Sequence, residues 1–235
     1  MTDTSKPPPG FATRLAEACA ALNLFCSPAQ RQALLGYLAL LQRWNGTYNL
    51  TSVRDPAAMF TQHLADCVAV VPAVQRHLEA GPRALHGRVL DVGSGGGLPG
   101  VVLAVLLPEL QVTCVDAVAK KTAFVRQIAS ELRLPNLQAV HARVESLKAA
   151  PFDLITSRAF ASLADFIRLT QALLAPGGAW MAMKGRVPQD EMNALPTGID
   201  VFHVEPLQVP GLDAQRCLVW MRPVSDPDSA PPARA

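Results

Sequence analysis

The stretch Val89-Leu90-Asp91-Val92-Gly93-Ser94-Gly95-Gly96-Gly97-Leu98-Pro99-Gly100 decides the fold. A short apolar run ends in an acid, and five of the next nine residues are glycine. A helical pattern follows at once. This order predicts a strand, a tight turn and a helix N-terminus, the arrangement in which α/β folds hold a nucleotide-like ligand. Glycines let the backbone turn with positive φ and lie close to that ligand, and free N–H groups at the helix end favour a carboxylate or a phosphate.

The second part of the chain alternates strand and helix patterns from Arg88 onward. Val201–Val209 and Arg216–Met221 have no helix between them, so they should pair as an antiparallel hairpin at the sheet edge. The alternation before them predicts parallel βαβ units, right-handed crossovers and helices on both faces of the sheet. Strands are expected at 88–92, 111–116, 137–141, 152–157 and 178–183, and helices at 99–107, 119–132 and 162–174.

The first part of the chain has a helical period. Ser27-Pro28 should open one helix as N-cap and first residue, and Asn45-Gly46 should close it. Asp55-Pro56 should start another helix or turn, and His63–Leu78 should form a further helix. The patterns together predict disordered tails at 1–10 and 225–235, a helical region at 11–85 and an α/β core at 86–224.

The composition is that of a globular chain. Half of the 235 residues are hydrophobic, enough for one large α/β domain or a core with a helical extension. The net charge of +2 is too small to argue for nucleic acid by itself, although a basic face can be hidden in a near-neutral total. The five cysteines lie far apart with no CxxC spacing, which predicts free thiols in a reducing compartment and no metal site.

The sequence also bears on location. The start of the chain is polar and Pro-rich, unlike a signal peptide. The longest apolar stretch, Val101–Leu107, is too short to span a bilayer. No long amphipathic surface requires a partner chain. We therefore expect a cytoplasmic monomer without membrane contact.

Two classes of nucleotide cofactor fit the glycine-rich turn. Gly95-x-Gly97-x-x-Gly100 satisfies the dinucleotide fingerprint, and Asp116 follows Gly95 by 21 residues, about where a ribose-binding acid is expected. An NAD-dependent oxidoreductase is therefore one reading. Against it, Asp91 would sit beside a pyrophosphate, and the terminal hairpin is not a second mononucleotide half.

An acid followed by Gly-x-Gly-x-Gly instead resembles the first motif of S-adenosylmethionine-dependent methyltransferases. In that reading Asp91 accepts the ammonium of the cofactor, directly or through water, and the N–H groups of the glycine loop bind its carboxylate. Asp116 ends the second strand, where its carboxylate can accept both ribose hydroxyls. The alternative role for Asp116 is the N-cap of the next helix.

Four more strings make a specific resemblance. They are Trp44-Asn45-x-x-Tyr48-Asn49-Leu50-Thr51-Ser52-Val53, His63-x-x-Asp66, Ser157-Arg158-Ala159-Phe160-Ala161 and Met183-Lys184-Gly185. With the glycine-rich stretch, they make residues 28–222 similar to the GidB family, the ribosomal small-subunit methyltransferases G. The resemblance implies a Rossmann-like class I methyltransferase sheet, mostly parallel with an antiparallel terminal strand, and a helical N-terminal extension.

The resemblance also implies an activity and a site. The reaction is methyl transfer from S-adenosylmethionine to N7 of a guanine in 16S ribosomal RNA, either as naked RNA or within the assembled small subunit. Gly96 departs from the family pattern, because many relatives carry Pro or Ala there. The implied cofactor contacts, added to Asp91 and Gly95 above, are Gly93, Leu98, Asp116, Ala117, Val118, Val144, Glu145 and Arg158.

Guanine N7 is an unprotonated acceptor, so methylation there requires no general base. Catalysis is then mainly positioning, and we assign no catalytic acid or base. The positioning candidates are Arg158, Lys184 and Asn49. The alternative for Arg158 is a surface ion pair with Asp153 or Asp165. The alternative for Lys184 is a solvated strand-end lysine, and Asn49 could simply be a turn residue. The candidate RNA contacts are Lys120, Lys121, Arg126, Lys184, Arg186 and Arg216.

His63 and Asp66 stand i, i+3 on one helix with no third metal ligand, so we expect a structural hydrogen bond near the cofactor pocket. A third reading, besides the two enzymes, is a non-catalytic RNA-binding assembly factor that retains the cofactor site.

Overall fold

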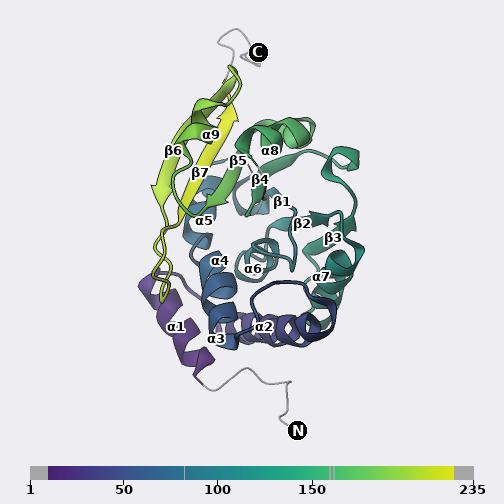
Figure 1. Cartoon of the computed structure of the whole chain (residues 1–235), viewed down its shortest axis with the longest axis vertical. Helices are drawn as coiled ribbons and strands as arrows, with labels where there is room; N and C mark the ends of the chain where they lie inside the picture. Colours follow the sequence, from purple (N-terminus) through teal and green to yellow (C-terminus); the bar gives the residue numbers. More distant parts are fainter. Residues whose placement is uncertain (1–9, 82, 159, 161, 225–235) are drawn as a thin grey trace, which may run out of the picture.

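The computed structural model describes residues 10–81, 83–158, 160 and 162–224. The predicted disordered tails lie outside these residues, apart from Gly10, and so do two alanines of the Ser157–Ala161 string. Seven strands form one sheet in the order β3-β2-β1-β4-β5-β7-β6 (Figure 1). Their bounds are β1 Arg88–Val92, β2 Gln111–Asp116, β3 Leu137–His141, β4 Phe152–Ser157, β5 Leu174–Lys184, β6 Ile199–Pro206 and β7 Cys217–Pro223.

The topology is the one expected from the sequence. Strands β1 to β5 pair in parallel, and β7 pairs antiparallel with both β5 and β6. The first four strands have the predicted bounds, whereas β5 begins earlier, at Leu174, because the chain is already extended where it pairs with Phe152. The hairpin strand β6 lies at the outer edge of the sheet (Figure 1).

Helices cover both faces of the sheet. The core helices are α6 Gly100–Leu106, α7 Ala119–Glu131, α8 Leu163–Thr170 and α9 Gln189–Asn193, with short 3-10 turns η2 Ala84–His86, η3 Val144–Ser146 and η4 Gln171–Leu173. The N-terminal helices are α1 Phe11–Ala21, α2 Pro28–Tyr48, α3 Pro56–Met59, the π-helix η1 Phe60–Ala65, α4 Asp66–Val68 and α5 Val71–Glu79.

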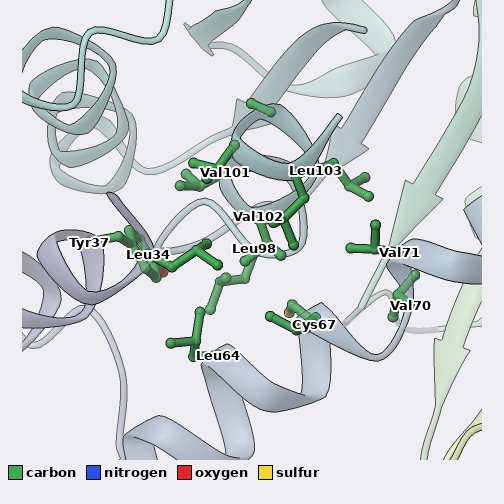
Figure 2. Packing of buried hydrophobic residues seen from close by; sticks show 14 of the residues in the cluster. Leu34, Tyr37, Leu64, Cys67, Val70, Val71, Leu98, Val101, Val102 and Leu103 are labelled. Atoms are coloured by element: carbon green, nitrogen blue, oxygen red, sulfur yellow. The ribbon is translucent and has the colours of Figure 1, made fainter. Parts of the chain in front are cut away.

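Two apolar clusters lie on opposite faces of the sheet. Alternate strand residues point to opposite faces, so Val89 joins one cluster and Leu90 the other. The N-terminal helices share the first cluster with α6 and α7. Figure 2 shows Leu34 and Tyr37 of α2 converging with Leu64, Leu98 and other residues around α6. The N-terminal helices and the sheet therefore share one continuous core.

Helix α2 begins as predicted but ends later. Ser27 Oγ accepts the N–H of Gln30, and Gln30 Oε1 accepts the N–H of Ser27, a complete capping box. The predicted end at Asn45-Gly46 is wrong, because the helix continues to Tyr48 and ends at Asn49 in the left-handed conformation. The Asn45 side chain binds Thr51 and Val53 and so fixes the loop beyond the helix.

A helical run extends from Pro56 to Glu79. Asp55 Oδ2 accepts the N–H of Ala58 at 2.7 Å and caps the start, so the predicted helix start at Asp55-Pro56 is confirmed, whereas the separate start at His63 is wrong. Nothing breaks the run before His63, which lies inside the π-helix η1. The run is long and apolar enough by composition to cross a membrane, but 78% of its most apolar window is buried inside the protein. The run therefore serves as a core helix here.

Helix α6 lies close against the sheet, because a glycine begins it. A Cβ at Gly100 would collide with Cys114 Sγ and come within 3.0 Å of Asp91 Oδ2. We expect Gly100→Ala to lower the free energy of unfolding by about 1–3 kcal/mol through overpacking. Denaturant unfolding measures this change.

Gly46→Ala is the matched control. This glycine lies inside α2 with no atom within 4 Å of an added Cβ, so alanine should stabilise the chain by about 0.5–1 kcal/mol. Equal unfolding midpoints for the two variants would contradict the proposed close packing.

Candidate functional site

Three cavities lie in a row at the carboxyl ends of the parallel strands, where open α/β sheets bind ligands. The β2–β3 cavity, of about 240 Å³, shares Gly93 with the glycine-loop cavity, of about 140 Å³. The glycine-loop cavity shares His63 and Arg158 with the arginine cavity, of about 330 Å³. Because they share lining residues, the three cavities are neighbours along this edge.

The glycine loop follows β1 and forms the floor of the second cavity. Gly93, Gly95 and Gly97 have φ of 66°, 57° and 87°, a region that L side chains rarely adopt. The N–H groups of Gly93 and Ser94 both donate to the carbonyl of Val115, which ties the loop to β2. The backbone therefore approaches the cavity closely, as the sequence predicts.

Helix α2 supports this loop from outside the sheet. The Tyr37 hydroxyl donates to the carbonyl of Gly96 at 2.9 Å. Leu41, Leu50 and Thr51 from the N-terminal helical region line the glycine-loop cavity together with Gly95 and Leu98. The N-terminal region is thus a wall of the site.

Asp116 ends β2, is 7% exposed and lines none of the three cavities, although Ala117 lines the β2–β3 cavity and Gly95 the glycine-loop cavity. Its Oδ2 accepts the N–H of Gly95 at 3.0 Å, and its Oδ1 accepts the N–H of Val118 at 2.8 Å. Lys121 Nζ stands 3.7 Å from Oδ2. Val118, not Asp116, is the N-cap residue of α7. The carboxylate keeps lone pairs for further donors, because each oxygen can accept more than one hydrogen bond.

Asp91 is placed differently from the sequence expectation. It is 0% exposed, and none of the described residues that line the three cavities is Asp91. Its Oδ2 accepts the N–H of Gly100 at 2.8 Å, while its Oδ1 has no partner among the described residues. The first N–H of α6 is thus bound internally. Direct contact of Asp91 with a ligand ammonium has no support in this geometry.

Arg158, directly after β4, joins the glycine-loop and arginine cavities. Its Nη1 donates to the carbonyl of Gln62 at 3.3 Å and stands 3.8 Å from Asp66 Oδ2 and 3.9 Å from Cys67 Sγ. All three partners lie on the helical run that contains η1. The suggested surface pairs with Asp153 and Asp165 are therefore wrong for Arg158. Sequence reasoning missed Gln62 and Cys67, because a π-helix leaves no clear pattern in the sequence.

His63 makes the structural hydrogen bond that we expected. Its Nε2 lies 2.8 Å from Thr51 Oγ1, and the N–H of Thr51 donates to Asn45 Oδ1. Burial is the main cause that lowers the pKa of His63 to about 4, so the ring is neutral near pH 7. His63 thus fastens the segment after α2 over the glycine loop.

The arginine cavity gathers three predicted residues. Arg158, Lys184 and Arg216 line it, and each is held in an ion pair. Lys184 Nζ lies 2.8 Å from Glu191 Oε2, and its side chain is 18% exposed, so it is not a solvated lysine. Glu191 lies in α9, seven residues after Lys184, and was not predicted.

Other residues that the sequence predicted as cofactor contacts line the β2–β3 cavity. Ala117, Val144 and Glu145 line it beside Phe160, whereas Val118 is exposed and outside its lining. Asn49 lies outside all three cavities, and its Oδ1 accepts a hydrogen bond from Arg54, consistent with a turn residue. Lys120, Arg126 and Arg186 are exposed. Among the residues that the structure describes, no cluster of His, Cys, Asp or Glu could hold a metal.

Asp91 gives the site a pH-dependent stability. Burial is the main cause that raises the pKa of Asp91 to about 7, above its value of 3.8 in an unfolded chain. Its contribution to stability is therefore complete below about pH 4 and is lost as the pH rises through about 7. Between pH 4 and 8 the unaltered protein should lose stability on the order of 4 kcal/mol through Asp91, and we expect Asp91→Asn to abolish this loss. Denaturant unfolding across this range measures it, and parallel curves for the two proteins would contradict it.

Two solved structures of low sequence identity have a similar fold. The crystal structure of TrmN from Thermus thermophilus has a TM-score of 0.54 and 22% identity over 70% of this chain and 53% of that chain. The glycopeptide N-methyltransferase MtfA, complexed with sinefungin, has a TM-score of 0.55 and 13% identity over 68% of this chain and 87% of that chain. These likenesses show the fold, a class I methyltransferase sheet.

Sequence relatives are much closer. The ribosomal RNA small subunit methyltransferase G of Methylibium petroleiphilum is 60% identical over 90% of this chain and 94% of its own length. The same enzyme of Leptothrix cholodnii is 61% identical over 87% of this chain and 92% of its own length. The family model described as rRNA small subunit methyltransferase G matches residues 30–219. The chain therefore belongs to the GidB family, the rRNA small subunit methyltransferases G.

Proposed function

We propose that this chain transfers the methyl group of S-adenosylmethionine to N7 of a guanine in 16S ribosomal RNA. The observation that carries the proposal is the row of three neighbouring cavities, with Arg158 lining the last two. Residues of the first two cavities would hold the cofactor, and the basic side chains of Arg158, Lys184 and Arg216 line the third. Membership of the family supports the RNA substrate.

Different groups of the described residues would hold the adenine, the ribose and the amino-acid end of the cofactor. Val144 and Glu145 in the 3-10 turn η3 would hold the adenine end, and Asp116 would accept from the ribose hydroxyls. The amide groups of the glycine loop, with Arg158 beyond them, would hold the amino-acid end. The orphaned Oδ1 of Asp91 lies behind this loop. Bound there, S-adenosylmethionine supplies a sulfonium methyl group, whose bond to sulfur breaks as the bond to N7 forms and sulfur keeps the electron pair.

The chain's own residues then position the reactants. N7 of guanine carries no proton, so no side chain has to remove one. Arg158 and Lys184 hold fixed positive groups beside the arginine cavity, where they orient the RNA. The neutral His63 and the buried Asp66 complete its wall. Asn49 lies outside this cavity and is a weaker positioning candidate.

RNA would meet the exposed basic residues outside this cavity. Arg186 follows β5, and Lys120 and Arg126 are exposed on α7. Lys121 is half-buried beside Asp116, and Arg216 is held by Asp66, so these two are secondary contacts. The RNA is presented as naked 16S RNA or in the assembled small subunit. Phosphate contacts of this kind weaken with salt.

We further propose a cytoplasmic monomer. The large hydrophobic side chains that are exposed in the described part of the chain are Phe25, Tyr48, Val118, Val187 and Val224, which are scattered along the sequence. A stable dimer needs a contiguous apolar surface. The helical region 11–85 acts in this proposal as a wall of the core at 86–224.

The NAD-dependent reading is disfavoured by one contact. A dinucleotide places its pyrophosphate against the free N–H groups at the start of the first crossover helix. Here the Gly100 N–H is already bound to the Asp91 carboxyl group, so it is not free to bind a pyrophosphate. Calorimetry with S-adenosylhomocysteine and with NAD separates the two readings. We expect heat of binding from S-adenosylhomocysteine alone, and saturation by NAD alone would overturn the proposal.

Transfer itself is tested with labelled S-adenosylmethionine. We expect label in 16S RNA, supplied naked or in small subunits, at N7 of one guanine that mass spectrometry can locate. No transfer to either substrate, with the cofactor bound, would favour a non-catalytic assembly factor.

The role of Asp116 is tested by Asp116→Ala. Losing the ribose acceptor should weaken binding of S-adenosylhomocysteine by about 2 kcal/mol, roughly 30-fold in Kd. Titration calorimetry measures the change. The control is Asp165→Ala, which removes an exposed acid paired with Arg168 on α8. Equal affinities for the two variants would remove Asp116 from the cofactor site.

A further inference from the structure

Asp66 lies where two arginines from different strands meet. It begins α4, directly after the π-helix η1, and is 3% exposed. Its Oδ1 accepts from Arg216 Nε at 2.8 Å, and its Oδ2 stands 3.8 Å from Arg158 Nη1. One buried carboxylate therefore holds both guanidinium groups.

The two arginines serve different parts of the site. Arg158 follows β4 and lines both the glycine-loop and the arginine cavity. Arg216 precedes β7 and lines the arginine cavity and a groove of about 860 Å³ beside the β6–β7 hairpin. Strand β5 separates β4 from β7, so Asp66 connects them across β5. It links the cofactor side of the site to the outer groove.

The charges in the arginine cavity give Asp66 a chemical role. Its described lining holds three cations, Arg158, Lys184 and Arg216, and one acid, Asp66. Lys184 is already paired with Glu191. A guanine methylated at N7 carries a positive charge, which the positive charges of the two arginines repel. The negative charge of the Asp66 carboxylate reduces this repulsion, and it acts strongly because little water screens it in this buried position.

Contacts other than those of Asp66 also dock the N-terminal helices. Gln30 binds the carbonyl of Val105 at the end of α6, and Tyr37 binds that of Gly96. The apolar cluster around α6 holds the same helices. A purely structural role for the two ion pairs would therefore duplicate contacts that are already present.

We propose that Asp66 is a positioning residue for methyl transfer, which fixes Arg158 and Arg216 around the target purine and offsets their charge as that purine becomes cationic. This inference rests on the proposed function. Asp66→Asn keeps the shape and removes the charge. We expect kcat to fall at least about 10-fold, while KM for 16S RNA and the Kd of S-adenosylhomocysteine change less than about threefold.

The controls separate positioning from folding. Asp200→Asn breaks an exposed acid–arginine pair with Arg222; neither residue lines any of the three cavities of the site, so kcat should stay unchanged. Asp66→Glu keeps the charge and should recover part of the activity. Melting temperatures are measured for each variant. If Asp66→Asn melts earlier but keeps its kcat at a temperature where it is folded, the proposal fails.

A second variant covers the case in which Asp66→Asn does not fold. Arg216→Lys keeps the positive charge and loses the Nε bond to Asp66. We expect a lower kcat with a small change in KM, and a raised KM with unchanged kcat would overturn the proposal. The two hypotheses fail separately, because absence of transfer by the unaltered protein refutes the proposed function, whereas active Asp66→Asn refutes only this inference.

Discussion

The hydrogen bond from the Gly100 N–H to the Asp91 carboxylate is the contact on which the site depends. It draws the start of α6 against β1 and β2, and only a glycine permits that approach. The glycine loop between Asp91 and Gly100 must then turn sharply, with three residues at positive φ. The same contact occupies the N–H that a pyrophosphate would use, so a local packing constraint also bears on the choice of cofactor.

The second constraint comes from outside the sheet. The N-terminal helices supply the hydroxyl that holds the glycine loop, the neutral imidazole that fastens the segment after α2, and the carboxylate that pairs two arginines. Tyr37 belongs to the apolar cluster that also contains the residues of α6, so the wall of the site packs against this helix. The π-helix η1 changes the hydrogen-bond register of the helical run at the point where Gln62, His63 and Asp66 line the arginine cavity. Helical irregularities of this kind often occur at functional sites.

Much of the fold could be predicted from the sequence, for a physical reason. Central parallel strands are buried on both faces, so β1, β2 and β4 are short apolar runs with clear limits. The helix ends were harder, because the Asn45-Gly46 signal was overridden by the tertiary role of the Asn45 amide. Asp55-Pro56 indicated a helix or a turn, and the sequence did not show that the helix begun there continues past His63.

The sequence motifs of the site could be predicted, but the ion pairs between residues far apart in the sequence could not. The glycine loop follows from local composition, whereas Asp66 and Arg216 are separated by 150 residues. The burial of Asp91 was equally invisible, since a strand-end acid has the same sequence whether it faces a ligand or a helix. Helix α6 has a further consequence, because all of its residues are buried between the sheet and the N-terminal helices. Its amides exchange hydrogen with solvent only when the whole domain opens, so their exchange rates report the global free energy of the fold.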